Sequence, residues 1–177
     1  MFDSLNIFKK PENSQLSESL DQLSKDYLSS SANKKIREAI DFADKAHEGQ
    51  FRKSGEPFIT HPINVGLILV SLKMDVDTVI AGLLHDVVED CDIPLSDVKK
   101  KFGNNVSQLV DGVTKLLQLD EKMKDQSQAE HFQKMALATA EDVRVVIIKL
   151  ADRLHNLKTI EHLPRDKQVK KCRETFD

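Results

Sequence analysis

Apolar side chains recur at intervals of three or four residues through most of the chain, and this period predicts amphipathic helices. Within residues 1–31, which are otherwise polar and rich in serine, Leu16, Leu20, Leu23 and Tyr27 keep this spacing and predict a short helix that packs on the main body. Longer apolar stripes predict helices at about 34–48, from 61 onward, and at 77–89, 104–117, 129–140 and 142–160, with a short one ending near Gly103.

Residues that favour caps and turns separate these stripes. Serines at 29–31 can cap the second predicted helix. Thr60 is expected to cap the helix that opens at His61, because a proline follows in the first turn, where the missing amide hydrogen costs nothing. The β-branched run 143–148 could form a strand in isolation, but the apolar residues after it keep a helical period and no partner strand is evident. The sequence therefore predicts an all-α fold.

The composition fits a globular protein with its own hydrophobic core, since 40% of the 177 residues are hydrophobic and 31% are charged. The net charge of −3 creates no field that would attract nucleic acid, so an anionic ligand must meet a local cluster of Lys and Arg. With one Tyr and no Trp, stacking platforms for single-stranded nucleic acid are scarce. We therefore expect no nucleic-acid partner.

The sequence also argues against secretion and membrane insertion. Residues 1–10 lack the basic start and long apolar stretch of a signal peptide. The longest uncharged run, 57–72, contains polar residues and falls short of the roughly 20 apolar residues of a membrane span. Cys91 and Cys172 are interpreted as reduced thiols, so we expect a cytoplasmic protein without a membrane contact.

Candidate chemistry comes from histidine and aspartate residues on or beside predicted helices. His85 and Asp86 are adjacent in LLHDVVED, His61 precedes them, and Asp152 follows. Two imidazoles and two carboxylates form a mixed nitrogen and oxygen site that suits Mn²⁺ and can also hold Zn²⁺ or iron. Neighbouring residues of a helix point about 100° apart, so the pair reaches one ion only across a seam between helices.

Taken singly, each of these residues is more often a cap, a surface charge or a satisfied polar group in the core. The adjacent pair argues against that interpretation, because it follows the apolar segment AGLL and precedes two valines, where burial is expected. A carboxylate buried there needs a partner or an ion.

The pattern H…HD…D resembles the HD superfamily of metal-dependent phosphohydrolases. Four longer strings resemble the hydrolase domain of long RelA/SpoT proteins: AHEGQFRKSGEPFITHP, AGLLHDVVEDCDIPL, LVDGVTKL and VIIKLADRLHNLKTIEHLP. The resemblance covers about residues 34–176, with the strings in the same order. The resemblance implies an HD-domain helical bundle with a metal site between helices. It also implies a Mn²⁺-dependent enzyme of the stringent response, which hydrolyses the 3′-pyrophosphate of the alarmones ppGpp and pppGpp to leave GDP or GTP and pyrophosphate.

Carried over by motif, the resemblance implies that four residues bind the metal: His61, His85, Asp86 and Asp152. It also implies that Glu89 and Asp90, the acids of HDxxED, are catalytic. The helical period agrees, because Glu89 follows His85 by four residues and Asp90 follows Asp86 by four. A carboxylate near the metal can orient the attacking water or take its proton. The plain alternative for both acids is a solvated helix end.

Substrate contacts are expected on two further segments. In RKSGEP the resemblance places Arg52, Lys53 and Ser54 against the nucleotide, and a guanidinium both stacks on planar rings and pairs with phosphate oxygens. Without the motif, a solvated basic loop would be the default. On the last predicted helix, Asn156 and Thr159 share a face with the aspartate of the metal set, and the resemblance places them at base-contacting positions.

Several charged and polar residues stay outside the predicted site. Lys149 and Arg153 could neutralise phosphates or could equally be surface charges. The other histidines are expected away from the metal: His47 and His155 in structural hydrogen bonds, His131 and His162 at the periphery.

For the domain organisation, the sequence predicts an N-terminal helix and linker at 1–31 and the HD hydrolase domain at 32–177. Long relatives continue into a synthetase domain and regulatory domains, so the resemblance implies a fragment of a bifunctional protein; a free-standing small hydrolase is the alternative. Two other functions stay open, namely an HD phosphohydrolase acting on another nucleotide and a catalytically silent, nucleotide-binding HD module. The RKSGEP loop and the complete HDVVED string favour the alarmone hydrolase.

Overall fold

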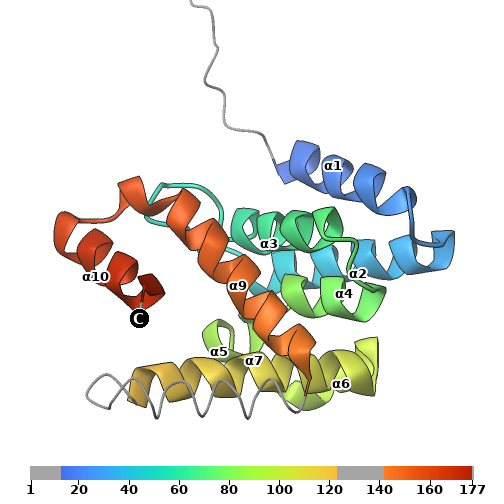
Figure 1. Ribbon diagram of the computed structural model, residues 1–177. Coiled ribbons are helices and arrows are strands. Elements are labelled where there is room, and N and C mark those ends of the chain that lie inside the picture. Colours follow the sequence, from blue (N-terminus) through green and yellow to red (C-terminus); the bar gives the residue numbers. More distant parts are fainter. Residues whose placement is uncertain (1–12, 123–141, 177) are drawn as a thin grey trace, which may run out of the picture.

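The computed structural model describes residues 13–122 and 142–176, and its regular elements in these ranges are helices, apart from an isolated bridge between Phe51 and Pro57. The elements are α1 (Asn13–Lys25), α2 (Ser30–Ala46), α3 (Thr60–Ser71), α4 (Val76–Leu83), α5 (Val87–Asp90), α6 (Leu95–Phe102), α7 (Asn104–Lys122), α9 (Val143–Lys158), the 3₁₀ turn η1 (Ile160–His162) and α10 (Arg165–Phe176). The predicted all-α helical bundle is confirmed (Figure 1).

Helix α9 holds the bundle together. It packs against α3, α4 and α7, which belong to distant parts of the chain, while α1 packs on α2 and α3. Figure 1 shows α9 running obliquely across α3 and α4 towards α7, with α10 to one side of it. Side chains on α9 therefore face residues far away in the sequence.

Buried apolar side chains repeat at the spacing that predicted the helices. Ile36, Ala39 and Ala43 form the inner face of α2. In α1, Leu20 is fully buried whereas Leu23 is 46% exposed, so the inner face of this helix is narrower than predicted. Within the described ranges, we find no helix with both the length and the apolar character needed to cross a bilayer.

Helices α3 and α4 approach each other closely at Gly82. A Cβ atom at this position would collide with Leu69 Cδ1 and would lie 3.5 Å from Val65 Cγ1. A larger residue at this position would force the side chain of Leu69 or the two helices to move. The contact bears on function, because His61 lies at the start of α3 and His85 follows the end of α4.

The helix predicted for 77–89 is wrong as a continuous element, because α4 ends before His85 and α5 begins after Asp86. In a continuous helix the carbonyl of Gly82 would accept a hydrogen bond from the amide of Asp86. Here that carbonyl accepts from Nδ1 of the His85 ring at 2.8 Å. The imidazole has taken the place of the backbone donor, and the His-Asp pair lies in the resulting break.

The predicted caps are right at one helix and wrong at another. Ser29 caps α2 by accepting a hydrogen bond from the amide of Ala32 at 3.2 Å. Thr60 does not cap α3; it is the first helical residue, and its hydroxyl donates to the carbonyl of Pro57 at 2.9 Å. The residue before it, Ile59, has helical dihedral angles, whereas a side-chain cap needs an extended backbone.

The C-terminal third resolves the ambiguity at 143–148, which is helical. Asp142 caps α9 with its carboxylate and starts the helix at the following residue. Helix α7 continues to Lys122, beyond the end predicted near 117. The helix predicted at 129–140 and the residue His131 lie outside the described residues.

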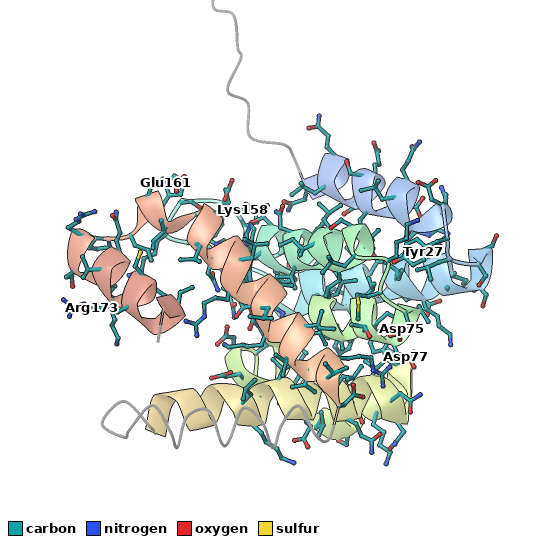
Figure 2. All side chains as sticks on the ribbon, in the orientation of Figure 1. Tyr27, Asp75, Asp77, Lys158, Glu161 and Arg173 are labelled. Atoms are coloured by element: carbon teal, nitrogen blue, oxygen red, sulfur yellow. The ribbon has the colours of Figure 1, made fainter. Side chains whose placement is uncertain are left out.

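The turn after α1 is tied to the turn between α3 and α4. The hydroxyl of Tyr27 donates to the carbonyl of Met74 at 2.9 Å, and the neighbouring Asp75 caps α4. In Figure 2, Tyr27 and Asp75 lie on one side of the molecule, whereas Lys158 and Glu161 lie on the other, where α9 passes into η1. The first helix is thus anchored away from the end of α9 that meets η1.

Candidate metal centre and nucleotide pocket

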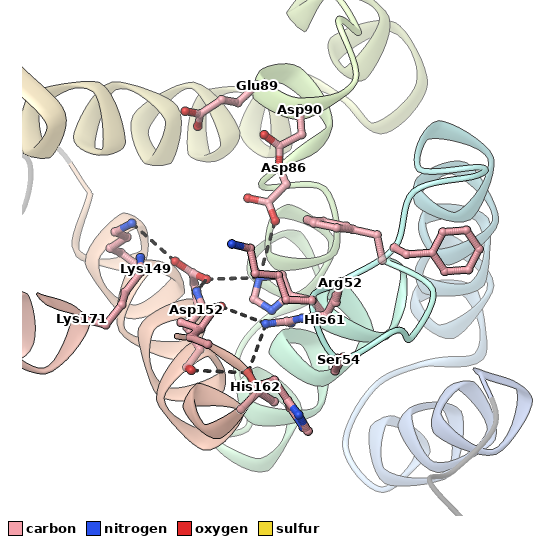
Figure 3. A pocket seen from close by; sticks show the side chains of 16 residues that line it. Arg52, Ser54, His61, Asp86, Glu89, Asp90, Lys149, Asp152, His162 and Lys171 are labelled. Carbon is pink, nitrogen blue, oxygen red and sulfur yellow. Dashed lines mark hydrogen bonds and ion pairs between the residues drawn. The ribbon is translucent and has the colours of Figure 1, made fainter. Parts of the chain in front are cut away.

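The four predicted metal ligands converge although they come from three separate segments. His61 lies in the first turn of α3, His85 and Asp86 lie in the break before α5, and Asp152 lies on α9. His61 Nε2 is 3.2 Å from Asp152 Oδ1 and 3.5 Å from Asp86 Oδ2 (Figure 3). His85 Nε2 is 3.0 Å from Asp86 Oδ1 and 3.8 Å from Asp152 Oδ1. Ligand atoms of His61, His85 and Asp86 all lie within 4.8 Å of one another, close enough for one ion.

The backbone sets the position of the hydrogen on His85. Nδ1 lies 2.8 Å from the carbonyl oxygen of Gly82, and because a carbonyl only accepts, Nδ1 carries the hydrogen. In the neutral ring Nε2 then holds a lone pair. It is buried and has no partner of hydrogen-bonding geometry among the described residues, although Asp86 Oδ1 is 3.0 Å away. A lone pair facing carboxylate oxygens is unfavourable unless a cation lies between them, so the residues fit a metal ion.

The charges of the cluster also suit a cation. Burial alone would lower the pKa of His85, but Asp86 and Asp152 raise it well above its usual value, so these carboxylates attract either a proton or a metal ion. Burial lowers the pKa of His61. Burial opposes ionisation of Asp152, yet His61 and His85 hold the pKa of its carboxyl well below the usual range. Neutral imidazoles with ionised carboxylates are the states that bind metal.

Two further side chains of α9 hold Asp152 in place. Asn156 Nδ2 donates to Asp152 Oδ1 at 2.6 Å, and Lys149 Nζ is 3.4 Å from Oδ2. Lys149 is only 8% exposed, and the sequence left it open between the pocket and the surface. Its position three residues before Asp152 was the available signal. Arg153 instead donates to Thr175 of α10 at 3.5 Å.

Arg52 reaches from the loop before α3 to the polar face of α9. Its Nη2 donates to Asn156 Oδ1 at 3.2 Å and to Thr159 Oγ1 at 3.1 Å, while Nη1 is 3.2 Å from His155 Nδ1. The same His155 nitrogen is 2.7 Å from Nδ1 of His61. Burial, together with His61 and Arg52, lowers the pKa of His155 to about 3, so its ring is neutral.

A cavity of about 420 Å³ opens over this cluster. The predicted site residues in its lining are Arg52, Lys53, Ser54, His61, Asp86, Glu89, Asp90, Asp152, Asn156 and Thr159. His85 is fully buried and does not reach the lining. The lining also includes Lys149, which the sequence left open, and Lys171, which the sequence missed. His162 was wrongly expected at the periphery, since η1 brings it to the cavity. In the view of Figure 3, Glu89, Asp90 and Asp86 lie at the top, with Lys149 and Lys171 on the left and Arg52 on the right.

Comparison with known proteins places this geometry in a family. Residues 39–177 match the family model described as HD domain. The chain belongs to the HD-domain family. The bifunctional (p)ppGpp synthase/hydrolase SpoT of Escherichia coli K12 is 48% identical to it over 162 residues, which are 92% of this chain and 23% of that protein. A GTP pyrophosphokinase of Streptomyces coelicolor is 50% identical over 150 residues, 85% of this chain and 18% of that protein.

A solved structure is also similar to this HD domain. It is that of a metazoan ortholog of SpoT, described as hydrolysing ppGpp, with 32% identity and a TM-score of 0.61 over 81% of this chain and 80% of that one. The chain spans less than a quarter of the length of the SpoT and pyrophosphokinase relatives it matches.

Glu89 and Asp90, the acids of the HDxxED string, both line the cavity, but only Asp90 lies one helical turn after its predicted neighbour. The amide of Asp90 donates to the carbonyl of Asp86 at 2.8 Å, so Asp90 lies one helical turn after Asp86. Glu89 does not lie one helical turn beyond His85, because the chain is not helical at His85. Burial and the charge of Asp86 raise the pKa of Asp90.

The end of this string is tied to the helix before the RKSGEP loop. His47 Nδ1 is 2.9 Å from Gln50 Oε1, and Gln50 Nε2 donates to the backbone carbonyl of Asp90 at 3.3 Å. The ring of His47 stacks on Phe58 with centroids 4.4 Å apart. His47 thus makes the structural hydrogen bond that the sequence led us to expect.

Proposed function

We propose that this HD domain is a metal-dependent phosphohydrolase that removes the 3′-pyrophosphate from ppGpp or pppGpp, leaving GDP or GTP and thereby controlling the level of the alarmone. The observation that carries the proposal is that one cavity lies over the His and Asp cluster and is also lined by the two acids of HDxxED and by Arg52 with its partners Asn156 and Thr159. The names of the relatives support it, since the Escherichia coli protein is a (p)ppGpp synthase/hydrolase and the metazoan ortholog hydrolyses ppGpp.

We assign the metal to His61, His85, Asp86 and Asp152, and we propose Mn²⁺ because two nitrogen and two oxygen donors suit it. Bound there, the ion would lower the pKa of the attacking water and offset charge on the phosphate oxygens. Lys149 and Asn156 would keep Asp152 oriented, since each contacts a different carboxylate oxygen.

Glu89 and Asp90 are the proposed proton-transfer groups. The oxygen of water attacks the phosphorus joined to the 3′ oxygen, that P–O bond breaks, and its electron pair passes to the 3′ oxygen. One carboxylate takes the proton that the water loses and passes it to the 3′ oxygen as that oxygen leaves. Burial and Asp86 raise the pKa of Asp90 towards the working range of a general base, which supports this role.

Lysines around the cavity would meet the phosphates. Lys53 is exposed and lies beside Lys167 of α10, whose proximity lowers the pKa of the Lys53 ammonium. Like charges brought together in this way are relieved by an anion between them. Lys149 and Lys171 lie in the same lining, so a nucleotide with two phosphorylated ends would meet a cation at more than one point.

Asn156 and Thr159 would recognise the base while Arg52 remains bound to them. A carbonyl oxygen has two lone pairs, so Asn156 Oδ1 can accept from Arg52 and from a guanine N–H at once. Its amide nitrogen already donates to Asp152, which keeps the oxygen turned towards the pocket. Guanine offers N1–H and N2–H₂ donors to such an acceptor, whereas adenine presents an acceptor at N1.

The direct test is product analysis with the purified protein, Mn²⁺ and ppGpp, followed by anion-exchange chromatography. We expect GDP and pyrophosphate, and the Glu89→Gln/Asp90→Asn double variant, prepared in the same way, controls for contaminating hydrolases. Faster turnover of dGTP than of ppGpp would favour an HD enzyme for another nucleotide. Binding of ppGpp without turnover in Mn²⁺, Mg²⁺ or Zn²⁺ would identify a silent module and overturn the proposal.

The silent module is the second candidate because the same residues are similar to proteins named for a pyrophosphokinase reaction. The complete HDVVED string, with both acids in the cavity lining, favours hydrolysis instead. The division into 1–31 and 32–177, a cytoplasmic location, and synthetase and regulatory domains in a longer protein stay predictions. The small share of the relatives' length that this chain covers supports the last of them.

A further inference from the structure

The side chain of His155 joins Arg52 to the metal site. Arg52 Nη1 is 3.2 Å from His155 Nδ1, and the same nitrogen is 2.7 Å from His61 Nδ1. His155 is buried, and its ring centroid lies 5.0 Å from that of His61. One nitrogen atom therefore contacts both the nucleotide pocket and a proposed metal ligand.

The donor and acceptor roles along this path follow from Arg52. A guanidinium only donates, so His155 Nδ1 must accept from it and carries no hydrogen. The 2.7 Å contact between the two rings then needs a hydrogen on His61 Nδ1, so the single lone pair of His155 Nδ1 is shared by two donors. A neutral His61 with its hydrogen on Nδ1 presents a lone pair at Nε2, the atom that faces Asp152 and Asp86.

We propose that His155 is a positioning residue that prepares two binding functions at once. It holds the ring and the hydrogen of His61 in the state that binds metal, and it holds the guanidinium of Arg52 at the nucleotide pocket. This inference rests on the metal site of the proposed function. Metal-binding histidines generally bond their second nitrogen to a carboxylate, carbonyl or water, which fixes the tautomer. Here the imidazole of His155 makes this bond to His61, and Arg52 determines that Nδ1 of His155 carries no hydrogen.

Asn156 makes a parallel connection from Arg52 to the other side of the metal site. Its oxygen accepts from Arg52 Nη2 at 3.2 Å, and its nitrogen donates to Asp152 Oδ1 at 2.6 Å. The amide cannot flip without facing the guanidinium with a donor. Arg52 thus keeps its contacts with Asn156 and Thr159 when His155 is changed, so the loss of nucleotide affinity should be smaller than the loss of metal affinity.

Two substitutions of His155 distinguish positioning from packing. His155→Asn places an amide oxygen where Nδ1 stands, and that oxygen has lone pairs for both Arg52 and His61. His155→Gln places its amide near the position of Nε2 and loses both contacts. On metal-stripped protein titrated with Mn²⁺ by calorimetry, we expect His155→Gln to bind about 10- to 100-fold more weakly, the usual effect of removing such a partner. His155→Asn should stay close to the wild-type affinity.

GDP titrations in the presence of Mn²⁺ test whether His155 holds Arg52 at the nucleotide pocket. GDP affinity should fall in His155→Gln and should stay close to that of the wild type in His155→Asn. For the Mn²⁺ titration, His162→Gln is the control: it changes a histidine of the same cavity lining and should keep the wild-type Mn²⁺ affinity. Thermal unfolding without metal confirms that each variant is folded.

The order of Mn²⁺ affinities in His155→Asn and His155→Gln tests whether His155 positions its neighbours or only fills space. If His155 only filled space, Gln, which is nearer to His in size, would preserve Mn²⁺ affinity better than Asn, and that order would overturn the proposal. Equal Mn²⁺ affinities in wild type and His155→Gln would overturn it as well, and unchanged GDP affinity would overturn the Arg52 half. A wild-type protein that bound none of Mn²⁺, Zn²⁺ and Fe²⁺ would remove the metal site itself, so failure of the proposed function is distinguishable from failure of this inference.

Discussion

The close approach of α3 and α4 predicts that one methyl group at Gly82 should disturb the metal centre from outside it. In Gly82→Ala the new Cβ would collide with Leu69 Cδ1 and would lie 3.5 Å from Val65 Cγ1. Leu69 is fully buried, so its side chain has no solvent to move into. Either Leu69 changes its rotamer within the packed core or the two helices shift relative to each other, and a shift would move His61 at the start of α3 and His85 after α4.

The magnitudes separate the effect on stability from the effect on metal binding. Overpacking a core costs about 1–3 kcal/mol, and replacing Gly by Ala inside a helix returns about 1 kcal/mol. The net loss of about 0–2 kcal/mol leaves a folded protein, since domains have about 5–15 kcal/mol of unfolding free energy. Metal–ligand distances tolerate only about 0.2 Å, so a shift between His61 and His85 should weaken Mn²⁺ binding by about tenfold or more.

The assay pairs chemical denaturation of metal-free protein with calorimetric Mn²⁺ titration. Val98→Ala is the control, because Val98 is fully buried in α6, which packs on α7 and carries no residue of the proposed site. It should lose stability and keep its metal affinity. Adding Leu69→Ala to Gly82→Ala should relieve the collision, so the two losses of stability should sum to more than the loss in the double variant. Wild-type Mn²⁺ affinity in Gly82→Ala, or strictly additive losses, would refute the reasoning.

Four other predictions concern the site directly. At a Mn²⁺ concentration 100 times the dissociation constant, wild type should gain about 2.7 kcal/mol of stability, whereas His85→Ala should gain none and lose hydrolysis, as thermal unfolding and product assays would show. Glu89→Gln/Asp90→Asn should keep metal and ppGpp binding while kcat falls by on the order of 10² or more, and an unchanged kcat would remove both acids from the mechanism. Because burial and Asp86 raise the pKa of Asp90, wild-type kcat/KM should fall as pH drops through a value above that of an ordinary aspartate, and a pH profile of Asp90→Asn should lack this limb. Finally, kcat/KM for ppGpp should exceed kcat/KM for ppApp by roughly ten- to a hundredfold in the wild type. Asn156→Ala should lower this ratio by a larger factor than it lowers kcat for ppGpp. Equal kcat/KM values for both nucleotides in the wild type would exclude the guanine contact.

Local patterns in the sequence were sufficient to predict most of the helices and the residue types of the site, although they did not predict the break at His85 or the helix α10. A stripe such as Ile36, Ala39 and Ala43 predicts α2, because helical spacing and burial of one face involve residues within a few turns. The adjacency of His85 and Asp86 after an apolar run marked a buried ionisable pair for the same local reason. The long motif strings then indicated the family that the comparisons confirm.

Interactions between distant segments decided what the patterns could not. The break at His85 depends on whether its ring or the next backbone amide reaches the carbonyl of Gly82, and the tertiary packing of α3 on α4 sets where that ring lies. The part played by His155 is similar, since it contacts Arg52, which lies 103 positions away in the chain, as well as His61. Helical period acts over a few residues, whereas burial and hydrogen-bond partners are settled only when separate helices pack. The sequence by itself therefore determined most of the helices and the residue types that carry the chemistry, whereas only the tertiary structure decided where the helix breaks at His85 and which atoms face one another.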